Sequence, residues 1–226
     1  MAQDLNGPRL PAKSGTAKQL VVFLHGYGAD GSDLIEIGRQ WQPWLPDAAF
    51  VSPHAPEPCA GAPMGRQWFP LTFRDPNERW RGVCHAGPTL DAFLDAELAR
   101  HQLSPDKLAL VGFSQGTMMA LHVGLRRQIA PAAVLGYSGL FVEPEASVPD
   151  PAADGPFARP PVLLVHGDAD EVIPAAALFL SANALAKRDV ACEWHLSTGI
   201  GHGIDGEGLR HGGLFLTRAF GLRYPA

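Results

Sequence analysis

The feature that most constrains this chain is a short stretch, residues 108–122, that predicts a strand, a sharp turn and a helix in immediate succession. An apolar run comes first, Gly-Phe-Ser-Gln-Gly follows, and an apolar segment compatible with a helix comes next. Such a turn strains the backbone of its middle residue, Ser114, while Gly112 and Gly116 carry no Cβ that would collide as strand and helix close together. We therefore expect Ser114 to project from the carboxyl edge of a sheet.

A serine hydroxyl is a weak nucleophile at neutral pH, so a catalytic Ser114 needs a histidine base and an acid that orients it. Residues 161–174 predict a buried strand, a turn that carries Asp168 and Asp170, and a helix. His202 follows the last predicted strand, between two glycines that suit an imidazole held on a loop. Nucleophile, acid and base thus occur in the order expected for a fold with this turn. These residues alone leave open which aspartate is the acid.

Apolar runs along the chain predict one α/β domain of 226 residues, because strands and helices alternate from residue 20 onward without a solvated linker. Continuous apolar strands of this kind are buried on both faces of a parallel sheet. Further strands are predicted at residues 19–24, 48–52, 132–137 and 190–196. Helices are predicted from about residue 30 to 44, from 87, from 115 to about 127, after 174, and at 206–220. Residues 1–18 suggest a loose tail or an edge hairpin.

Residues 53–88 differ from the rest of the chain in composition, since they contain seven prolines and several large apolar side chains. Prolines keep such a segment out of regular structure, and its aromatic residues need a surface to bury against. Two interpretations stay open: a loop that folds over the active site and lines an acyl pocket, or a long connection fastened to the body by its aromatic residues. Long connections in compact domains are often binding loops.

The Gly-rich turn after the first strand, residues 25–31, is by itself an ordinary strand-to-helix connection. Beside a serine nucleophile it gains a second interpretation. The backbone amide of Tyr27 becomes a candidate donor to an oxyanion, with the amide of Gln115 as its partner.

Other polar residues have simpler explanations. His166, Asp168 and Asp170 lie within five residues of one another, but ligands this close on one turn would need metal-binding partners from elsewhere. Ser138 lacks the glycine spacing of the first turn and no helix pattern follows, so it indicates a strand end. His211, inside the terminal helix, is expected at the surface or in packing.

Composition excludes several classes of partner. The formal charge is −5 and the pI is near 6.0, with no block of lysine and arginine, which disfavours nucleic acid and anionic membranes as partners. No apolar stretch approaches the roughly 20 residues of a membrane span, so we expect no stable membrane anchor. Cys59, Cys84 and Cys192 lack metal-type spacing and residues 1–18 lack a signal-peptide core, which predicts the cytoplasm. A monomer and a homodimer are both compatible with this composition.

Four motifs together resemble the phospholipase/carboxylesterase family of α/β-hydrolases, which includes acyl-protein thioesterases, lysophospholipases and bacterial carboxylesterases. The motifs are His-Gly-Tyr-Gly at 25–28, Gly-Phe-Ser-Gln-Gly at 112–116, His-Gly-Asp-Ala-Asp-Glu-Val-Ile-Pro at 166–174 and Gly-His at 201–202. The resemblance covers residues 18–222. The second motif alone is only moderately specific, whereas its combination with the third and fourth at these spacings is strongly so.

The resemblance implies an α/β-hydrolase fold with a mostly parallel sheet, helices on both faces and no large cap domain. It implies Ser114 as nucleophile, His202 as base, and Asp170 rather than Asp168 as the orienting acid. No cofactor and no metal are implied, because the acyl-enzyme cycle is self-sufficient.

The resemblance also implies that the amides of Tyr27 and Gln115 form the oxyanion hole. Within 53–88 it suggests an acyl-groove loop. The expected substrate contacts of that loop are Met64, Trp68, Phe69 and Leu71. The chain departs from relatives at Pro70, where the family often has Asp, and at Tyr27, where Leu is common.

The expected reaction is hydrolysis of carboxylic esters of short to medium acyl chains through an acyl-enzyme on Ser114. One alternative uses the same triad on another acyl donor, as an acyl-protein or acyl-CoA thioesterase or a lysophospholipase. A second, a dienelactone-hydrolase-like enzyme, should carry cysteine at position 114. A third is a non-catalytic binding module on the same fold, for which a broken triad would be the signature.

Overall fold

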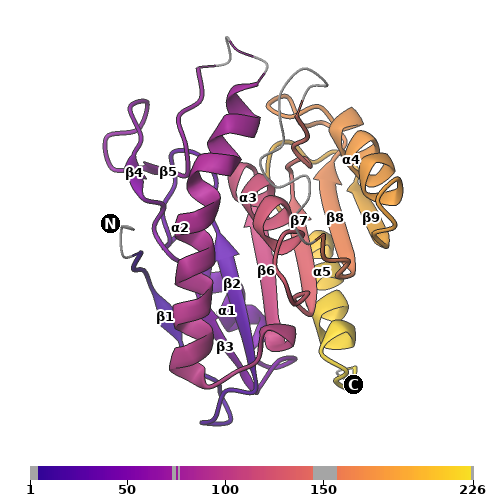
Figure 1. Cartoon of the computed structure of the whole chain (residues 1–226). Coiled ribbons are helices and arrows are strands. Elements are labelled where there is room, and N and C mark those ends of the chain that lie inside the picture. Colours follow the sequence, from indigo (N-terminus) through magenta and orange to yellow (C-terminus); the bar gives the residue numbers. More distant parts are fainter. Residues whose placement is uncertain (1–4, 73–74, 76, 145–156, 225–226) are drawn as a thin grey trace.

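The fold is built on a seven-stranded sheet with the strand order β1-β3-β2-β6-β7-β8-β9, seen in the computed structural model of residues 5–72, 75, 77–144 and 157–224 (Figure 1). The strands of this sheet are β1 (Arg9–Leu10), β2 (Gln19–Leu24), β3 (Ala48–Val51), β6 (Leu108–Phe113), β7 (Ala133–Tyr137), β8 (Val162–Gly167) and β9 (Cys192–Ser197). β1 pairs antiparallel with β3, and the other neighbouring strands pair in parallel. The carboxyl ends of six strands therefore meet at one edge.

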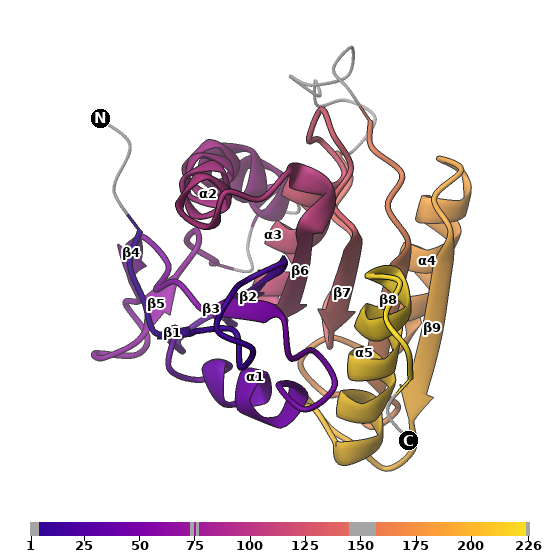
Figure 2. The same ribbon diagram turned by 90° about the horizontal axis from the view of Figure 1, so that it is seen from below.

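Helices cover both faces of the sheet (Figure 2). They are α1 (Ile35–Trp41), α2 (Glu78–His101), α3 (Gln115–Gly124), α4 (Ala176–Ala186) and α5 (Gly206–Ala219), while the short 3-10 helix η1 (Pro105–Lys107) connects α2 to β6. Side chains of α2, α3 and α4 join one hydrophobic core, and those of α1 and α5 join the other. Alternate residues of β2 serve the two cores, with Leu20 and Val22 on one face and Val21 and Phe23 on the other. Among the described residues, none of the helices has the length and apolar character that a membrane span requires.

The predicted strands and the predicted terminal helix are confirmed to within two residues, and α1 and α3 are shorter than expected. Residues 1–18 contribute an edge strand rather than a hairpin, since Leu10 pairs with Phe50 of β3; residues 1–4 lie outside the described residues. The edge strand is also tied to α2. Arg9 donates from Nε and Nη2 to the two carboxylate oxygens of the buried Glu97, at 3.2 and 2.7 Å.

The prediction for residues 53–88 was wrong in one respect, because α2 begins at Glu78 and continues through Pro88. Proline inside a helix removes one hydrogen bond and costs about 3 kcal/mol or more locally. Here tertiary burial offsets that cost. Trp80 and Val83 are buried in the core, and Gly82 packs so closely on the Phe69 ring that a Cβ there would lie 2.2 Å from it. Within the same segment, β4 (Glu57–Pro58) pairs with β5 (Arg66–Gln67), and residues 73, 74 and 76 lie outside the described residues.

His25, at the end of β2, fastens the connections above the sheet edge. Its Nδ1 lies 2.8 Å from the Gly26 carbonyl oxygen, and since a carbonyl can only accept, Nδ1 carries the proton. Its Nε2 then accepts the Ala55 amide at 3.0 Å, while its own carbonyl accepts Trp68 Nε1 at 3.0 Å. Complete burial of the ring lowers the pKa of His25 to about 4. The neutral imidazole thus binds the backbone of Gly26 and Ala55, and the backbone carbonyl of the same residue holds Trp68.

We expect acid to weaken the fold through His25. The unfolded chain takes up this proton near pH 6.5, whereas the folded chain resists it until about pH 4. The free energy of unfolding contributed by His25 is therefore present above pH 6.5 and falls as the pH is lowered toward 4, by on the order of 3 kcal/mol over the window.

Urea unfolding of the wild type and of His25→Gln between pH 4.5 and 7 measures this contribution. The variant should be less stable at pH 7 and should lose less stability on acidification. His85→Gln, at an exposed histidine, is the control and should follow the wild type. Equal slopes in the wild type and His25→Gln would contradict this account of His25.

Candidate active site

Ser114 stands in the sharp turn between β6 and α3 with φ 53° and ψ −115°, a conformation that side chains other than glycine rarely adopt. The two flanking glycines make this turn possible. A Cβ on Gly112 would lie 2.4 Å from the Gly116 carbonyl carbon, and a Cβ on Gly116 would lie 1.8 Å from the Leu24 carbonyl oxygen. The predicted strained turn, with glycines required on either side of it, is confirmed.

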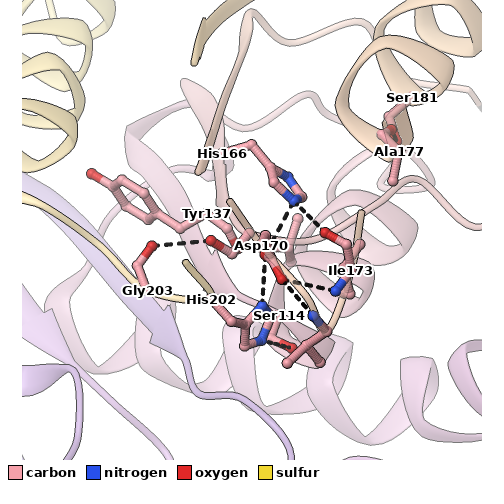
Figure 3. A network of polar contacts seen from close by, with 12 residues as sticks. Ser114, Tyr137, His166, Asp170, Ile173, Ala177, Ser181, His202 and Gly203 are labelled. Atoms are coloured by element: carbon pink, nitrogen blue, oxygen red, sulfur yellow. Dashed lines mark hydrogen bonds and ion pairs between the residues drawn. The ribbon is translucent and has the colours of Figure 1, made fainter. Parts of the chain in front are cut away.

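The Ser114 hydroxyl contacts the imidazole of His202, which comes from the loop between β9 and α5. Ser114 Oγ lies 3.0 Å from His202 Nε2, and His202 Nδ1 lies 2.8 Å from Asp170 Oδ2 (Figure 3). A carboxylate only accepts, so Nδ1 carries the proton and Nε2 is left to accept the serine proton. The structure brings together the three side chains that the sequence predicts.

Asp170 is buried at the turn after β8, and its two carboxylate oxygens receive separate sets of donors. Oδ1 accepts the amides of Val172 and Ile173, each at 2.9 Å, and Oδ2 accepts His202. Burial alone would raise the pKa of this carboxyl, but the hydrogen bonds from His202, Ile173 and Val172 outweigh it and hold the pKa below its usual range. The group therefore carries a full negative charge beside the imidazole.

The second aspartate of the turn points elsewhere. Asp168 is exposed, and its Oδ1 accepts the Gly199 amide at 2.6 Å. It ties the end of β8 to the loop that carries His202. The geometry thus distinguishes the two aspartates, either of which could be the acid on the sequence alone. Asp170 contacts the His202 imidazole, whereas the side chain of Asp168 binds the backbone amide of Gly199.

His166 is a member of this network that sequence reasoning missed. Its Nε2 lies 2.8 Å from the Ile173 carbonyl oxygen and 3.2 Å from Asp170 Oδ2 (Figure 3). Because the carbonyl can only accept, Nε2 is a donor, and Asp170 lies between two imidazole N–H groups. The available signal in the sequence is the spacing of four residues between His166 and Asp170 across a tight turn.

Ser138 was predicted as a strand end, and β7 does end at the residue before it. Its role goes further. Ser138 Oγ donates to the Gly203 carbonyl oxygen at 3.0 Å, next to His202, from a backbone with φ 44°. A Ser-Gly pair at the same sheet edge as the nucleophile turn was the available signal.

The candidate oxyanion donors lie against the serine. Gly26 packs so close that a Cβ on it would lie 3.3 Å from Ser114 Cβ, which sets the following residue, Tyr27, beside the site. Gln115 is the first residue of α3, where an amide has no acceptor within the helix. For the Tyr27 amide, no acceptor is found in the described part of the chain. Both amides are thus available to a bound oxyanion.

The Gln115 side chain fastens the proline-rich loop over the site. Its Oε1 accepts the Trp68 amide at 2.9 Å, and its Nε2 donates to the Phe69 carbonyl at 2.8 Å. Trp68 and Phe69 are 1% and 0% exposed, so they offer no surface to a substrate. The expectation that this pair contacts the acyl chain is not supported by its burial, because both rings pack into the core.

The other two expected substrate contacts differ from each other. Met64 is 90% exposed and lines a hollow of about 690 Å³ with Gly28 and Ala62, next to the candidate oxyanion donor Tyr27. Leu71 is half-buried and packs against the core. Met64 is therefore the most exposed of the four expected substrate contacts, in a hollow that no triad residue lines.

The sequence and the fold both match known proteins. A profile of the phospholipase/carboxylesterase family matches residues 5–218. Esterase YpfH of Escherichia coli (strain K12) is 29% identical over 194 residues, covering 86% of this chain and 80% of that protein. Acyl-protein thioesterase 1 of Schizosaccharomyces pombe is 29% identical over 170 residues, covering 73% and 74%.

Solved structures agree with this. The crystal structure of esterase PE8 superposes with a TM-score of 0.89 at 43% identity, covering 96% of this chain and 100% of that one. The carboxylesterase of Bacillus cereus superposes with a TM-score of 0.77 at 16% identity and supports the fold alone. The chain therefore belongs to the phospholipase/carboxylesterase family and has the α/β-hydrolase fold that its four motifs predict.

Proposed function

We propose that this carboxylic ester hydrolase cleaves esters of short to medium acyl chains through an acyl-enzyme formed on Ser114. The observation that supports this most is the continuous series of contacts from the Ser114 hydroxyl through His202 to the buried carboxylate of Asp170. A nucleophile, a base within hydrogen-bond reach and a third group that orients the base are the parts that acyl transfer requires.

In the first half of the cycle, Ser114 Oγ attacks the ester carbonyl carbon while its proton passes to His202 Nε2. Asp170 stabilises the imidazolium that results, because its charge lies against Nδ1–H. The carbonyl oxygen becomes an oxyanion and accepts the amides of Tyr27 and Gln115. Collapse of this intermediate expels the alcohol, which takes the proton from His202, and leaves the acyl group on Ser114.

In the second half, water takes the place of the alcohol. His202 Nε2 removes a proton from the water, and the oxygen attacks the acyl carbon. The second tetrahedral intermediate then releases the carboxylic acid and returns the proton to Ser114 Oγ. Side chains and backbone amides of this chain supply every group in both halves.

The length of the acyl chain is inferred from the surroundings of Met64. Because Trp68 and Phe69 are buried in the core, the loop does not present them as walls of a deep channel. The hollow beside Met64 is an open surface feature lined by Gly28, the residue after Tyr27, and it is not a deep channel. A small-molecule substrate of moderate length fits this arrangement.

The compartment and the oligomeric state are also expectations. No disulfide joins Cys59, Cys84 and Cys192, all of which lie in the described part of the chain, and this supports the cytoplasm as the compartment. A monomer or a homodimer remains the prediction for assembly.

Ser114→Ala should reduce kcat on p-nitrophenyl butyrate by on the order of 10⁶, because the acyl-enzyme can no longer form. Near-identical thermal unfolding of the two proteins would show that the fold is kept. Wild-type protein should also be labelled by a fluorophosphonate and Ser114→Ala should not. Retention of most of the wild-type rate, or labelling of the variant, would refute the role of Ser114 as the nucleophile. A wild type that neither turns over the ester nor is labelled would favour a non-catalytic module.

The two aspartates of the β8 turn provide a matched pair. Asp170→Asn should lower kcat by about 10⁴, since the amide favours the wrong tautomer of His202. Asp168→Asn should mainly lower stability, because it weakens the bond to the Gly199 amide. Both variants are compared by kcat on p-nitrophenyl butyrate and by urea unfolding, and the reverse ranking of kcat at equal stability would move the acid to Asp168.

A second candidate, thioester hydrolysis by the same triad, is favoured by the similarity to a protein described as acyl-protein thioesterase 1. We expect kcat/KM to be higher for p-nitrophenyl butyrate and octanoate than for palmitate, and higher for esters than for acyl-CoA thioesters of equal length. A preference for palmitoyl thioesters would favour a thioesterase. A preference for lysophospholipid would favour a lysophospholipase. The serine at position 114 argues against the dienelactone-hydrolase type, whose nucleophile is cysteine.

A further inference from the structure

One group of titratable side chains outside the active site has no part in the reaction. It consists of His195 on β9 with Glu207 and His211 on α5, and one donor atom from each lies within 4.8 Å of the other two. Glu207 and His211 stand one helical turn apart, with His211 Nε2 3.7 Å from Glu207 Oε1. The rings of His195 and His211 face each other with centroids 4.3 Å apart.

One ring nitrogen of this group lacks a hydrogen-bond partner in the described part of the chain, although His195 itself is only half-buried. His195 Nε2 is shielded from solvent and has no hydrogen-bond partner among the described residues. A buried polar atom left in this state costs about 1–3 kcal/mol, so native proteins usually satisfy such atoms. A cation bound through a ring nitrogen of His195 would give this imidazole a polar partner.

We propose that His195, Glu207 and His211 form a Zn²⁺ site that joins β9 to α5. Two imidazole nitrogens and one carboxylate are a donor set that zinc uses in proteins, with water as the fourth ligand. Calcium and magnesium prefer oxygen ligands throughout and suit this set poorly.

The donor atoms of the three side chains lie within 4.8 Å of one another, which is farther apart than in a formed zinc site. Donor atoms on one tetrahedral zinc lie about 3.4 Å apart, so the three side chains must draw together on binding. The side chains of His211 and Glu207 are 38% and 65% exposed, which leaves them room to rotate toward His195. An i,i+4 pair on a helix keeps its two donors on one face throughout that movement.

Charge around the group suits a cation. Glu207 supplies one negative charge directly, and the Asp205 carboxylate, at the N-cap of α5, interacts electrostatically with His195. Arg218, a cation close to the group, pairs with Glu193 in a hollow lined also by His195 and His211. Its charge is therefore largely balanced before an ion binds.

A zinc ion at this position would clamp the two elements that flank the loop carrying His202. Because it would bind the folded chain and not the unfolded one, it should raise the thermal midpoint as its concentration rises. None of its three ligands is a member of the triad of Ser114, His202 and Asp170.

The test measures Zn²⁺ binding to tag-free protein by competition with a chromophoric chelator, and the thermal midpoint with added ZnCl₂ or CaCl₂. Wild type and His202→Ala should each bind one zinc at this site and be stabilised by zinc and not by calcium. His211→Ala and Glu207→Gln should lose that stabilisation and bind zinc at least about tenfold more weakly. His85→Ala, at an exposed histidine outside the group, should match the wild type.

The two helix variants change exposed side chains, so each is expected to fold, and circular dichroism without metal checks this. The proposal is overturned if zinc does not stabilise the wild type. It is also overturned if both His211→Ala and Glu207→Gln keep the full shift, or if His202→Ala alone removes it, which would place the ion in the catalytic triad.

Discussion

The close approach of α3 to the end of β2 is the constraint on which the active site depends. No side chain can stand at position 116, because a Cβ would lie 1.8 Å from the Leu24 carbonyl oxygen. This contact brings the first amide of α3 beside the turn that carries Tyr27. It also turns Ser114 toward the carboxyl edge of the sheet, at a backbone conformation that is costly for serine. Packing of the whole sheet against α3 maintains that conformation.

The charge of Asp170 then determines that the proton passes from Ser114 to His202. Asp170 accepts two backbone amides on one oxygen and the His202 N–H on the other, and His166 Nε2 lies 3.2 Å from that second oxygen, so its negative charge is stable despite burial. A fixed anion at Nδ1 selects the tautomer of His202 that leaves Nε2 free to accept from Ser114. His166 contributes through Asp170 alone, and it acts as a positioning residue.

The sequence could predict what depends on local pattern. Buried parallel strands are continuous apolar runs, so the sheet was visible, and the triad followed from the turn at Ser114 and the order of the motifs. What it missed depends on contacts between distant segments. Pro88 argues locally against a helix, yet burial of Trp80 and the fit of Gly82 on Phe69 extend α2 past it.

The proline-rich loop is a second case in which contacts with distant segments decide the structure. Its aromatic residues were equally compatible with a substrate groove and with attachment to the body. The deciding groups come from other parts of the chain: the Gln115 side chain bonds the backbone of Trp68 and Phe69, and the His25 carbonyl bonds the Trp68 indole. No periodicity within the loop could show these partners.

The position of His202 is set less by its own glycine-rich loop than by bonds on both sides of it. Before it, Asp168 holds the Gly199 amide; after it, Ser138 holds the Gly203 carbonyl. Asp205 then caps α5 by accepting the Gly208 amide at 2.9 Å, and it accepts the hydroxyl of Ser197 at the end of β9 at 2.9 Å. The base therefore lies between two glycines, but its loop is held by side-chain hydrogen bonds from the ends of three neighbouring strands, β7, β8 and β9. This explains how a loop between two elements keeps an imidazole within 3.0 Å of a serine that lies 88 residues away in the sequence.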